Sequence, residues 1–294
     1  MSDWMAIVNP QSGGTARRSR LLKIVHQLER FTDTIVFTKC PGHAAQIAMA
    51  STKYLGIAAV GGDGTLLEIL KGLNRKDQRI AIIAAGRGNS LARDLGIFGE
   101  VANLNFFITQ QPTLVDLMEV KYRTRSGFEG KILSASAVAF GYPSVVAHAA
   151  RKFALLGRHA YVAAAATRRP LAFHVEIATE NQRAQTRCLR GLVIGNTRHL
   201  ANFLAFPDGS CQDGFFDVME LDAGFFRQNL HNVSALLGSR FCGPSALVRT
   251  RSAQIRLEAP QPLLIDGEIF PDVVSMDVRI LPRELACNWR EERG

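Results

Sequence analysis

The 294-residue sequence predicts an α/β fold, in which a doubly wound parallel sheet is followed by a β-rich, sandwich-like second domain. Two observations lead to this prediction. In the first part of the chain, short and fully apolar runs alternate with stretches of helical periodicity, which is typical of a parallel sheet covered on both faces. Further on, apolar and polar residues alternate with a period of two, which indicates half-exposed antiparallel strands. The predicted domains are therefore residues 1–117 and 118–294.

Each predicted strand of the first domain is a short apolar run. The first, Trp4–Val8 (WMAIV), leads into a helix predicted at 17–31, where apolar residues recur at helical spacing. The other strands are predicted at 34–38, 56–60 and 80–85, and the helices that follow them at 43–54, 65–73 and 90–95.

The second domain is predicted to contain antiparallel strands around one helical stretch. The residues at 145–168 are rich in alanine, which favours a helix. The segments that alternate between apolar and polar residues are LVDLMEVKY at 114–122 and the runs at 173–178, 253–259 and 274–280.

The composition indicates a folded protein with an excess of positive charge. Hydrophobic residues make up 47% of the chain and charged residues 21%, and the formal net charge is +9. Such a charge predicts attraction to polyanions, including anionic lipid headgroups and phosphorylated ligands. The basic groups at 16–20 and 167–170 are too short for a nucleic-acid arm, so we expect no nucleic-acid partner.

The cysteines and the N-terminus indicate a cytoplasmic location. The five cysteines are scattered and form no CxxC pair, which favours reduced thiols over a zinc site or a disulfide framework. The first residues lack the pattern of a signal peptide, and no apolar run reaches the roughly 18 residues that span a bilayer. We therefore expect a cytoplasmic protein that meets a membrane only from the water side.

Three glycine-containing loops follow predicted strands of the first domain: NPQSGG at 9–14, GGDGT at 61–65 and GRGN at 86–89. In an open parallel sheet such loops gather at the carboxyl ends of the strands, where ligands bind. Glycine allows close approach, and the amides of the following helix attract an anion. Three such loops together predict a crevice that binds phosphate, although one alone would more often be a simple turn.

The central loop, GGDGTLLEIL, contains residues that glycine turns do not require. Thr65 is expected to cap the next helix, with Glu68 three residues later as in a capping box. Asp63 would repel phosphates as a bare carboxylate, so metal coordination, a ribose hydroxyl or an orienting hydrogen bond are the roles left open for it. The loop matches neither the P-loop nor the GxGxxG dinucleotide pattern.

Two further segments have a simple structural interpretation when taken alone. LLIDGEIF, at 263–270, has the Asp-Gly pair of a type I′ hairpin between two β runs. SCQDGFFDV, at 210–218, contains a plausible turn at Gln212–Phe215.

Taken in order, NPQSGG, GGDGTLLEIL, GRGNSLARDLGI and LLIDGE resemble the motifs of the diacylglycerol kinase catalytic family, which includes soluble bacterial lipid kinases, sphingosine kinases and ceramide kinases. The resemblance extends from about residue 5 to 282. It implies an α/β nucleotide domain, a β-sandwich-like second domain and an active site in the cleft between them. GGDG alone is also similar to NAD kinases and phosphofructokinases.

The resemblance assigns roles to individual residues. It implies that Asp266 and Glu268 are the catalytic carboxylates, either of which accepts the proton of the substrate hydroxyl, with Glu268 preferred; a catalytic Mg²⁺ held by the pair is the alternative. It also implies that a structural Mg²⁺ binds Asp213 together with backbone oxygens near Ser210 and Phe215. The residues implied to hold ATP are Asn9, Pro10, Gln11, Ser12, Gly13, Thr38, Gly62, Asp63, Gly64, Thr65, Leu66, Leu67 and Glu68, to which the third loop adds Arg87 and Asn89.

The sequence departs from the family pattern at several positions. Arg87 and Ser90 stand where the family usually has the threonine and aspartate of GTGND, Leu67 stands where asparagine is common, and Pro143 where aspartate is typical. The segment at 195–209 lacks the paired glycines expected before its proline. Since a guanidinium pairs bidentately with phosphate, Arg87 is predicted to contact the phosphates or the ribose region of the nucleotide. Asn89 or Ser90 is predicted to cap the next helix.

The resemblance thus implies an ATP- and Mg²⁺-dependent kinase that phosphorylates a hydroxyl of a diacylglycerol-like or sphingoid-like lipid at a membrane surface. The alternatives are a non-catalytic nucleotide- or lipid-binding protein with the same fold, and a kinase of a soluble acceptor such as NAD. The sequence leaves open which lipid is used and the oligomeric state, a homodimer included.

Overall fold

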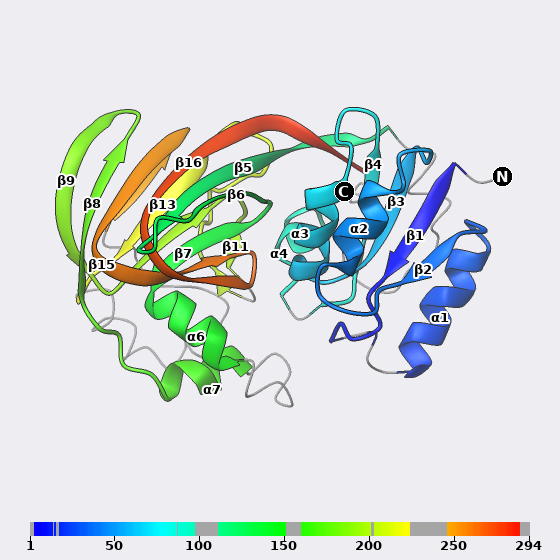
Figure 1. Cartoon of the computed structure of the whole chain (residues 1–294), viewed down its shortest axis with the longest axis horizontal. Coiled ribbons are helices and arrows are strands. Elements are labelled where there is room, and N and C mark those ends of the chain that lie inside the picture. The colour runs from blue at the N-terminus through cyan, green and yellow to red at the C-terminus, as the bar shows by residue number, and fades with distance from the viewer. Residues whose placement is uncertain are drawn as a thin grey trace. The chain divides into compact units, whose positions relative to one another are not determined.

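The computed structural model describes residues 3–13, 15, 18–86, 88–97, 111–150, 160–200, 203–223 and 246–288. The chain divides into two compact units, one made of Met1–Asp116 with Arg283–Gly294 and the other of Leu117–Pro282 (Figure 1). The sequence placed the whole of 118–294 in the second domain, whereas the last strand returns to the first unit. It returns because the end of β16 (Glu268–Asn288) pairs with β4 (Arg79–Ala84) at Cys287, which is fully buried.

The first unit is built on a parallel sheet, as predicted. Its strands run in the order β16-β4-β3-β1-β2, and every neighbouring pair is parallel. The strands β1 and β3 are buried along their whole length, as expected for strands that are covered on both faces. Besides β4 and the end of β16, the strands are β1 (Trp4–Val8), β2 (Ile35–Phe37) and β3 (Gly56–Gly61).

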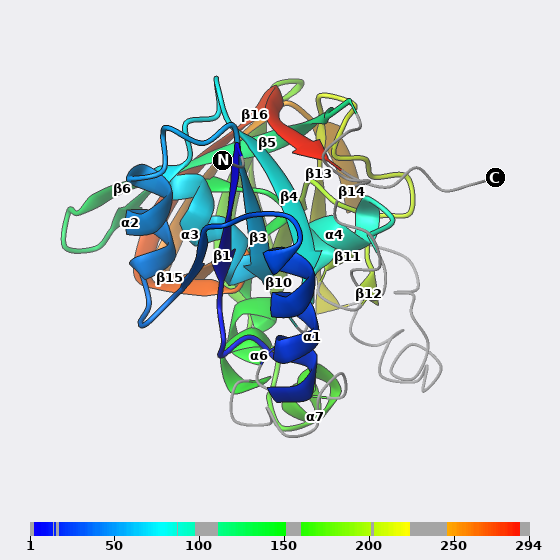
Figure 2. The same ribbon diagram turned by 90° about the vertical axis from the view of Figure 1, so that its right-hand side faces the viewer.

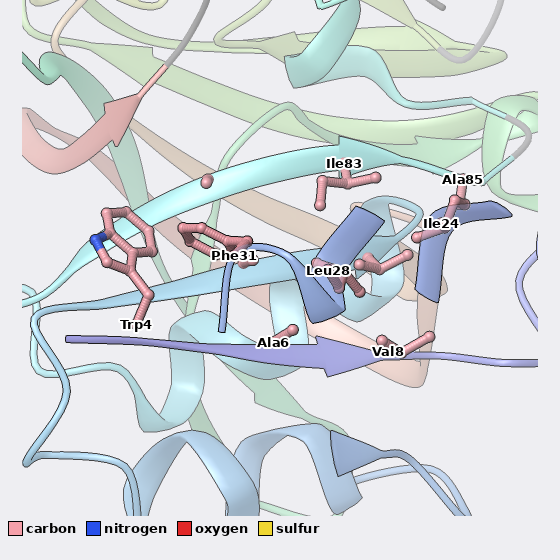
Figure 3. Close-up of a cluster of buried hydrophobic side chains, with 11 residues drawn as sticks. Trp4, Ala6, Val8, Ile24, Leu28, Phe31, Ile83 and Ala85 are labelled. Atoms are coloured by element: carbon pink, nitrogen blue, oxygen red, sulfur yellow. The ribbon is translucent and has the colours of Figure 1, made fainter. Parts of the chain in front are cut away.

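Helices cover both faces of this sheet, so the doubly wound arrangement is confirmed. The helices are α1 (Arg18–Glu29), α2 (His43–Met49), α3 (Asp63–Gly72) and α4 (Ser90–Asp94). In Figure 2, α1 lies on one side of β1 and β3, and α2 and α3 lie on the other. Ile24 and Leu28 of α1 pack with Phe31 against Trp4 and Val8 in a buried cluster (Figure 3).

The second unit is rich in antiparallel strands, as the period-two patterns predicted. Its helices are α6 (Tyr142–Ala150) and α7 (Ala160–Ala166), which occupy both ends of the predicted helical stretch, and residues 151–159 lie outside the described part. Its strands are β5 (Thr113–Thr124, which begins in the first unit), β6 (Glu129–Ser134), β7 (Ala137–Gly141), β8 (Phe173–Thr179), β9 (Gln182–Leu189), β10 (Gly191–Gly195), β11 (His199–Leu200), β12 (Phe203–Leu204), β13 (Phe216–Leu221), β14 (Ala246–Thr250), β15 (Ser252–Ile265) and most of β16.

Strand β15 joins two groups of strands within this unit. Residues 253–257 pair with β8, whereas residues 263–265 pair with β7, and the register against β16 shifts between Arg256 and Gln261. Such a shift bends a strand. Strand β15 therefore pairs with the β8–β9 hairpin near its start and with the β7–β10–β13–β14 group of strands at its end.

Strand β5 differs from the half-exposed strand that its alternating sequence predicts. Its polar residues Asp116 and Glu119 are buried, at 0% and 4% exposure. They are tolerated because each has partners: Asp116 accepts a hydrogen bond from the Arg283 amide, and Glu119 is paired with Arg279 and Lys131. Periodicity alone could not reveal these partners.

The pairing of Glu119 predicts a pH dependence of stability. Burial raises the pKa of this carboxyl, but the hydrogen bonds and charges of Lys131 and Arg279 outweigh that effect and lower it below 4.5. A lowered pKa contributes stability that is present above the unfolded-state value and is lost as pH falls through the folded-state value. Urea unfolding of wild type and E119Q between pH 7 and 3 should show that the variant loses part of the acid sensitivity; identical pH profiles would contradict this prediction.

Among the described residues Cys40, Cys188, Cys211 and Cys287 are free thiols, and Cys242 lies outside them. Among the described residues, none of the helices is both long and apolar enough to cross a bilayer.

Candidate functional site

The three glycine loops come together at the carboxyl ends of β1, β3 and β4. The Asn9 side-chain amide donates a hydrogen bond to the Thr65 hydroxyl at 2.9 Å, which joins the first loop to the second. The Ser90 amide donates to the Asp63 carboxylate at 2.8 Å, which joins the second loop to the third. The predicted gathering of the loops is therefore present in the first unit.

Gly62 and Gly86 hold the second and third loops in backbone contact. A Cβ added to Gly86 would lie 2.3 Å from the Gly62 Cα, and one added to Gly62 would lie 2.8 Å from the Gly86 Cα. Backbone atoms cannot move aside as a flexible side chain can, so both positions require glycine for their close approach.

Asn9 shapes the first loop. Its side-chain oxygen accepts a hydrogen bond from the Gln11 amide at 3.0 Å, and its backbone carbonyl accepts from the Thr15 hydroxyl at 2.6 Å and from the Ser12 amide at 3.3 Å. Pro10 and Gly13 lie in the same turn, and Thr38 follows β2, where its amide donates to the Val8 carbonyl.

Helix α3 begins two residues before the predicted start, so the predicted capping box is wrong. Gly62 is the N-cap and Thr65 is the third helical residue, whose hydroxyl accepts the bond from Asn9. Glu68 instead accepts a hydrogen bond from the Ala44 amide at 3.2 Å, at the start of α2. The start of the helix packs the Thr65 side chain against Gly61, where an added Cβ would lie only 2.4 Å from it.

This earlier start changes which of the predicted nucleotide residues lie at the loop. Leu66 and Leu67 are buried in α3, at 6% and 0% exposure, and their side chains form part of the core. The loop end of the helix is Gly62, Asp63 and Gly64, and no atom lies within 4 Å of a Cβ built on Gly64. The first-turn amides of a helix have no intrahelical acceptor and carry the positive end of the helix dipole, so this end can bind an anion.

Asp63 makes an orienting hydrogen bond, which is one of the roles that the sequence left open for it. Its carboxylate accepts from the first amide of α4, which is a capping interaction supplied from another loop. Asn89 is the N-cap residue of α4 with φ 51°, but its side chain does not cap. It exchanges two hydrogen bonds with the Gly86 backbone, at 2.9 and 3.0 Å. Arg87 lies outside the described residues.

The DGE segment in the second unit is a hairpin turn. Asp266 and Gly267 have φ values of 44° and 93°, and Ile265 pairs with Glu268 across the two-residue connection. The hairpin interpretation of these residues is thus correct, and the turn places the carboxylates of Asp266 and Glu268 in different environments.

The Asp266 carboxylate is buried and bonded on all sides by the Ser134–Ala137 segment. It accepts hydrogen bonds from the Ala135, Ser136 and Ala137 amides and from the Ser134 and Ser136 hydroxyls, at 2.6–3.1 Å. Burial raises the pKa of Asp266, and the donors oppose that rise by stabilising the anion. Burial is the larger effect, so the pKa stays above its usual value, and the five hydrogen bonds hold the carboxylate and its turn in place.

Glu268 has a different environment. It is only partly buried, and it lies on the same face of β16 as Phe270, two residues along the strand. Tyr122 packs against Phe270 with ring centroids 5.1 Å apart. Burial raises the pKa of Tyr122, and the negative charge of Glu268 raises it further, so the carboxylate lies near this aromatic group.

The loop that was predicted to bind Mg²⁺ contacts Arg249 instead. The Asp213 carboxylate accepts a hydrogen bond from the Phe215 amide at 3.0 Å and forms an ion pair with Arg249 at 3.1 Å, and the Ser210 hydroxyl accepts from the Gln212 amide at 3.3 Å. The residues present do not fit a metal on Asp213, because the guanidinium already contacts the carboxylate that would hold it. No group of three or more His, Cys, Asp or Glu side chains suited to a metal occurs in the described ranges. The Asp213 contact to Mg²⁺ that the resemblance implies is thus taken by Arg249.

Sequence reasoning missed Ser134, Ser136 and Arg249. The serines stand in an ordinary strand-to-strand connection, and Arg249 stands 32 residues from Asp217, so no local pattern marks either contact.

Comparison with known proteins agrees with the motif order. Residues 3–120 match the diacylglycerol kinase catalytic domain. The chain is 25% identical to a diacylglycerol kinase of Bacillus subtilis over 282 residues, which cover 89% of this chain and 88% of that one. It is 32% identical to sphingosine kinase B of Dictyostelium discoideum over 136 residues, 38% of this chain and 18% of that one.

The fold is likewise that of a solved structure. A diacylglycerol kinase from Bacillus anthracis strain Sterne superposes with a TM-score of 0.78 at 24% identity, covering 98% of this chain and 96% of that one. The resemblance drawn from the motifs is confirmed, since residues 3–120 match the diacylglycerol kinase catalytic domain.

Proposed function

We propose that this protein is an ATP-dependent lipid kinase that transfers the γ-phosphate of MgATP to a hydroxyl of a diacylglycerol-like or sphingoid-like lipid. The observation that carries the proposal is the set of three hydrogen-bonded glycine loops within the matched catalytic domain, with open space above Gly64. Phosphoryl transfer depends mainly on positioning and on stabilising charge, and these loops supply both.

The first unit binds the nucleotide in this proposal. The α3 N-terminus at Gly62–Gly64 receives a phosphate group, and the Asn9 loop forms the neighbouring wall. Asp63 does not meet the phosphate directly; its bond to the Ser90 amide keeps the third loop in position. Mg²⁺, which arrives with ATP, supplies neutralisation of the phosphate charge.

The second unit supplies the proton acceptor. Glu268 takes the proton of the lipid hydroxyl as the hydroxyl oxygen attacks the γ-phosphorus, the bond from phosphorus to the β,γ-bridging oxygen breaks and ADP leaves. The buried Asp266 keeps the turn that carries Glu268 rigid. Tyr122 and Phe270 give this carboxylate an apolar neighbour, which suits an acceptor with hydrocarbon chains.

Anionic lipid headgroups are the proposed partner surface. Arg168 and Arg169 are exposed, and Leu171, two residues further on, is 76% exposed. Near an anionic bilayer each such arginine contributes about 1 kcal/mol, and the leucine can enter the interface. The net charge of +9 favours the same approach.

A direct test uses purified protein, labelled ATP, MgCl₂ and a panel of acceptors: diacylglycerol, sphingosine, ceramide and phosphatidylglycerol in mixed micelles, with NAD as the soluble member. We expect label in one of the lipids. Label in NAD alone would establish the soluble-acceptor alternative, and measurable ATP binding with label in no acceptor would favour the non-catalytic alternative.

Gly64→Ala separates nucleotide binding from folding. The added methyl meets nothing in the folded protein, and alanine favours a helix over glycine by roughly 0.5–1 kcal/mol, so stability should stay the same or rise. The methyl enters the space proposed for a phosphate, so ATP affinity measured by calorimetry should fall at least tenfold.

Gly86→Ala is the matched control for that variant. Its methyl collides with the Gly62 backbone, so both stability and ATP affinity should fall. Unchanged ATP affinity in Gly64→Ala would exclude this end of α3 as the phosphate site.

A further inference from the structure

Arg249 contacts three oxygens in and beside the loop that connects β12 to β13. Arg249 on β14 lies directly opposite Asp217 on β13 in the antiparallel ladder. Its Nε atom is 3.3 Å from the Asp217 carboxylate, and its Nη2 atom is 3.1 Å from the Asp213 carboxylate. The same Nη2 donates a hydrogen bond to the Asp208 carbonyl at 2.6 Å.

The Asp213 and Asp217 carboxylates and the Asp208 carbonyl therefore all contact the Arg249 guanidinium. This combination of carboxylate and carbonyl oxygens is the set that proteins offer to Ca²⁺ or Mg²⁺. Here the planar guanidinium contacts all three oxygens, with Nε at the Asp217 carboxylate and Nη2 at the Asp213 carboxylate and the Asp208 carbonyl.

The arginine also balances the charge of the loop. Asp217 is almost fully buried, with 5% of its side chain exposed, and a buried carboxylate requires a partner. Burial raises the pKa of Asp217, Arg249 opposes that rise, and the charges of Asp213 and Asp208 add a smaller increase. Arg249 pairs with both the Asp213 and Asp217 carboxylates, whereas two other arginines meet the loop elsewhere, Arg198 at the Gly209 carbonyl and Arg251 over the Phe215 ring.

We propose that Arg249 serves as the internal cation of the 208–217 loop, so that this loop is ordered without the structural divalent metal that the motif resemblance implies. The guanidinium and a divalent cation are alternatives at this place, and removing the arginine opens the loop to the metal. The inference concerns the stability of the second unit and does not depend on the proposed kinase activity.

The test measures thermal unfolding without nucleotide, so that Mg²⁺ bound with ATP does not contribute. Wild type and R249A are dialysed against EDTA and then melted in NaCl, MgCl₂ or CaCl₂ at matched ionic strength. Wild type should unfold at the same temperature in all three salts. R249A should unfold roughly 5 °C lower in NaCl and regain most of that loss in MgCl₂ or CaCl₂.

Two further variants make the result specific. R249A/D213N removes one of the proposed metal ligands, so it should show no recovery with either metal. R249K keeps the charge but offers one nitrogen in place of the planar fork, so it should unfold between wild type and R249A. It replaces R249A if that variant does not fold.

Three outcomes would overturn the inference. One is a wild-type protein that MgCl₂ stabilises in a saturable way, another is an R249A protein as stable as wild type in EDTA, and the third is a destabilised R249A that neither metal restores.

Discussion

Glu268→Gln should abolish phosphoryl transfer while leaving the protein folded. Glutamine keeps the size and the polar surface of the side chain but cannot accept a proton, and loss of a general base typically costs a factor of about 10²–10⁴ in rate. Because Glu268 is only partly buried, the free energy of unfolding should change by less than about 0.5 kcal/mol. The rate is measured at saturating ATP and lipid, and ATP affinity by calorimetry.

The matched control is Glu268→Asp, which keeps a carboxylate on a shorter side chain. It should retain more transfer than Glu268→Gln, because a displaced base still accepts a proton. If Glu268→Gln kept the full rate with normal ATP affinity, Glu268 would not be the proton acceptor.

Asp266→Ala should be among the most destabilising substitutions in the second unit. It leaves the Ala135, Ser136 and Ala137 amides without their acceptor, and each buried unpaired donor costs about 1–3 kcal/mol. Alanine is also strained at the φ of 44° that Asp266 adopts. A loss of about 3–5 kcal/mol in urea unfolding is expected.

Asp266→Asn distinguishes a positioning role from a catalytic one. Asparagine tolerates positive φ and keeps the acceptor for the Ser136 and Ala137 amides, but its NH₂ group would face the Ala135 amide, so it should lose only about 1–3 kcal/mol. At a temperature where it is folded, it should retain most of the transfer rate. A stable but inactive Asp266→Asn would instead identify Asp266 as the proton acceptor.

The sequence was sufficient for the parallel sheet and for the glycine loops because both are encoded in local patterns. Fully apolar strands such as β3 and loops such as NPQSGG can be recognised from a few consecutive residues. The order of the motifs, rather than any one of them, also identified the catalytic domain that residues 3–120 match.

The contacts that give each polar side chain its role were beyond local patterns, because the partners are distant in the chain. Asp63 bonds an amide 27 residues away, Glu68 one 24 residues away, and Asp266 a serine 132 residues away. The same reason explains β5, where Glu119 is buried against Arg279, 160 residues further on. The sequence therefore showed which polar side chains were present, but the fold was needed to decide whether each one binds a ligand or supports the structure.

The most direct test of lipid kinase activity is to identify the phosphorylated product by mass spectrometry after incubating wild type with MgATP and mixed micelles of the lipid panel. Wild type should form a lipid phosphate ester that is absent with Glu268→Gln, when the two proteins are compared at equal concentration and equal ATP occupancy. ATP bound by wild type with no lipid phosphorylated, or the same product from both proteins, would contradict it.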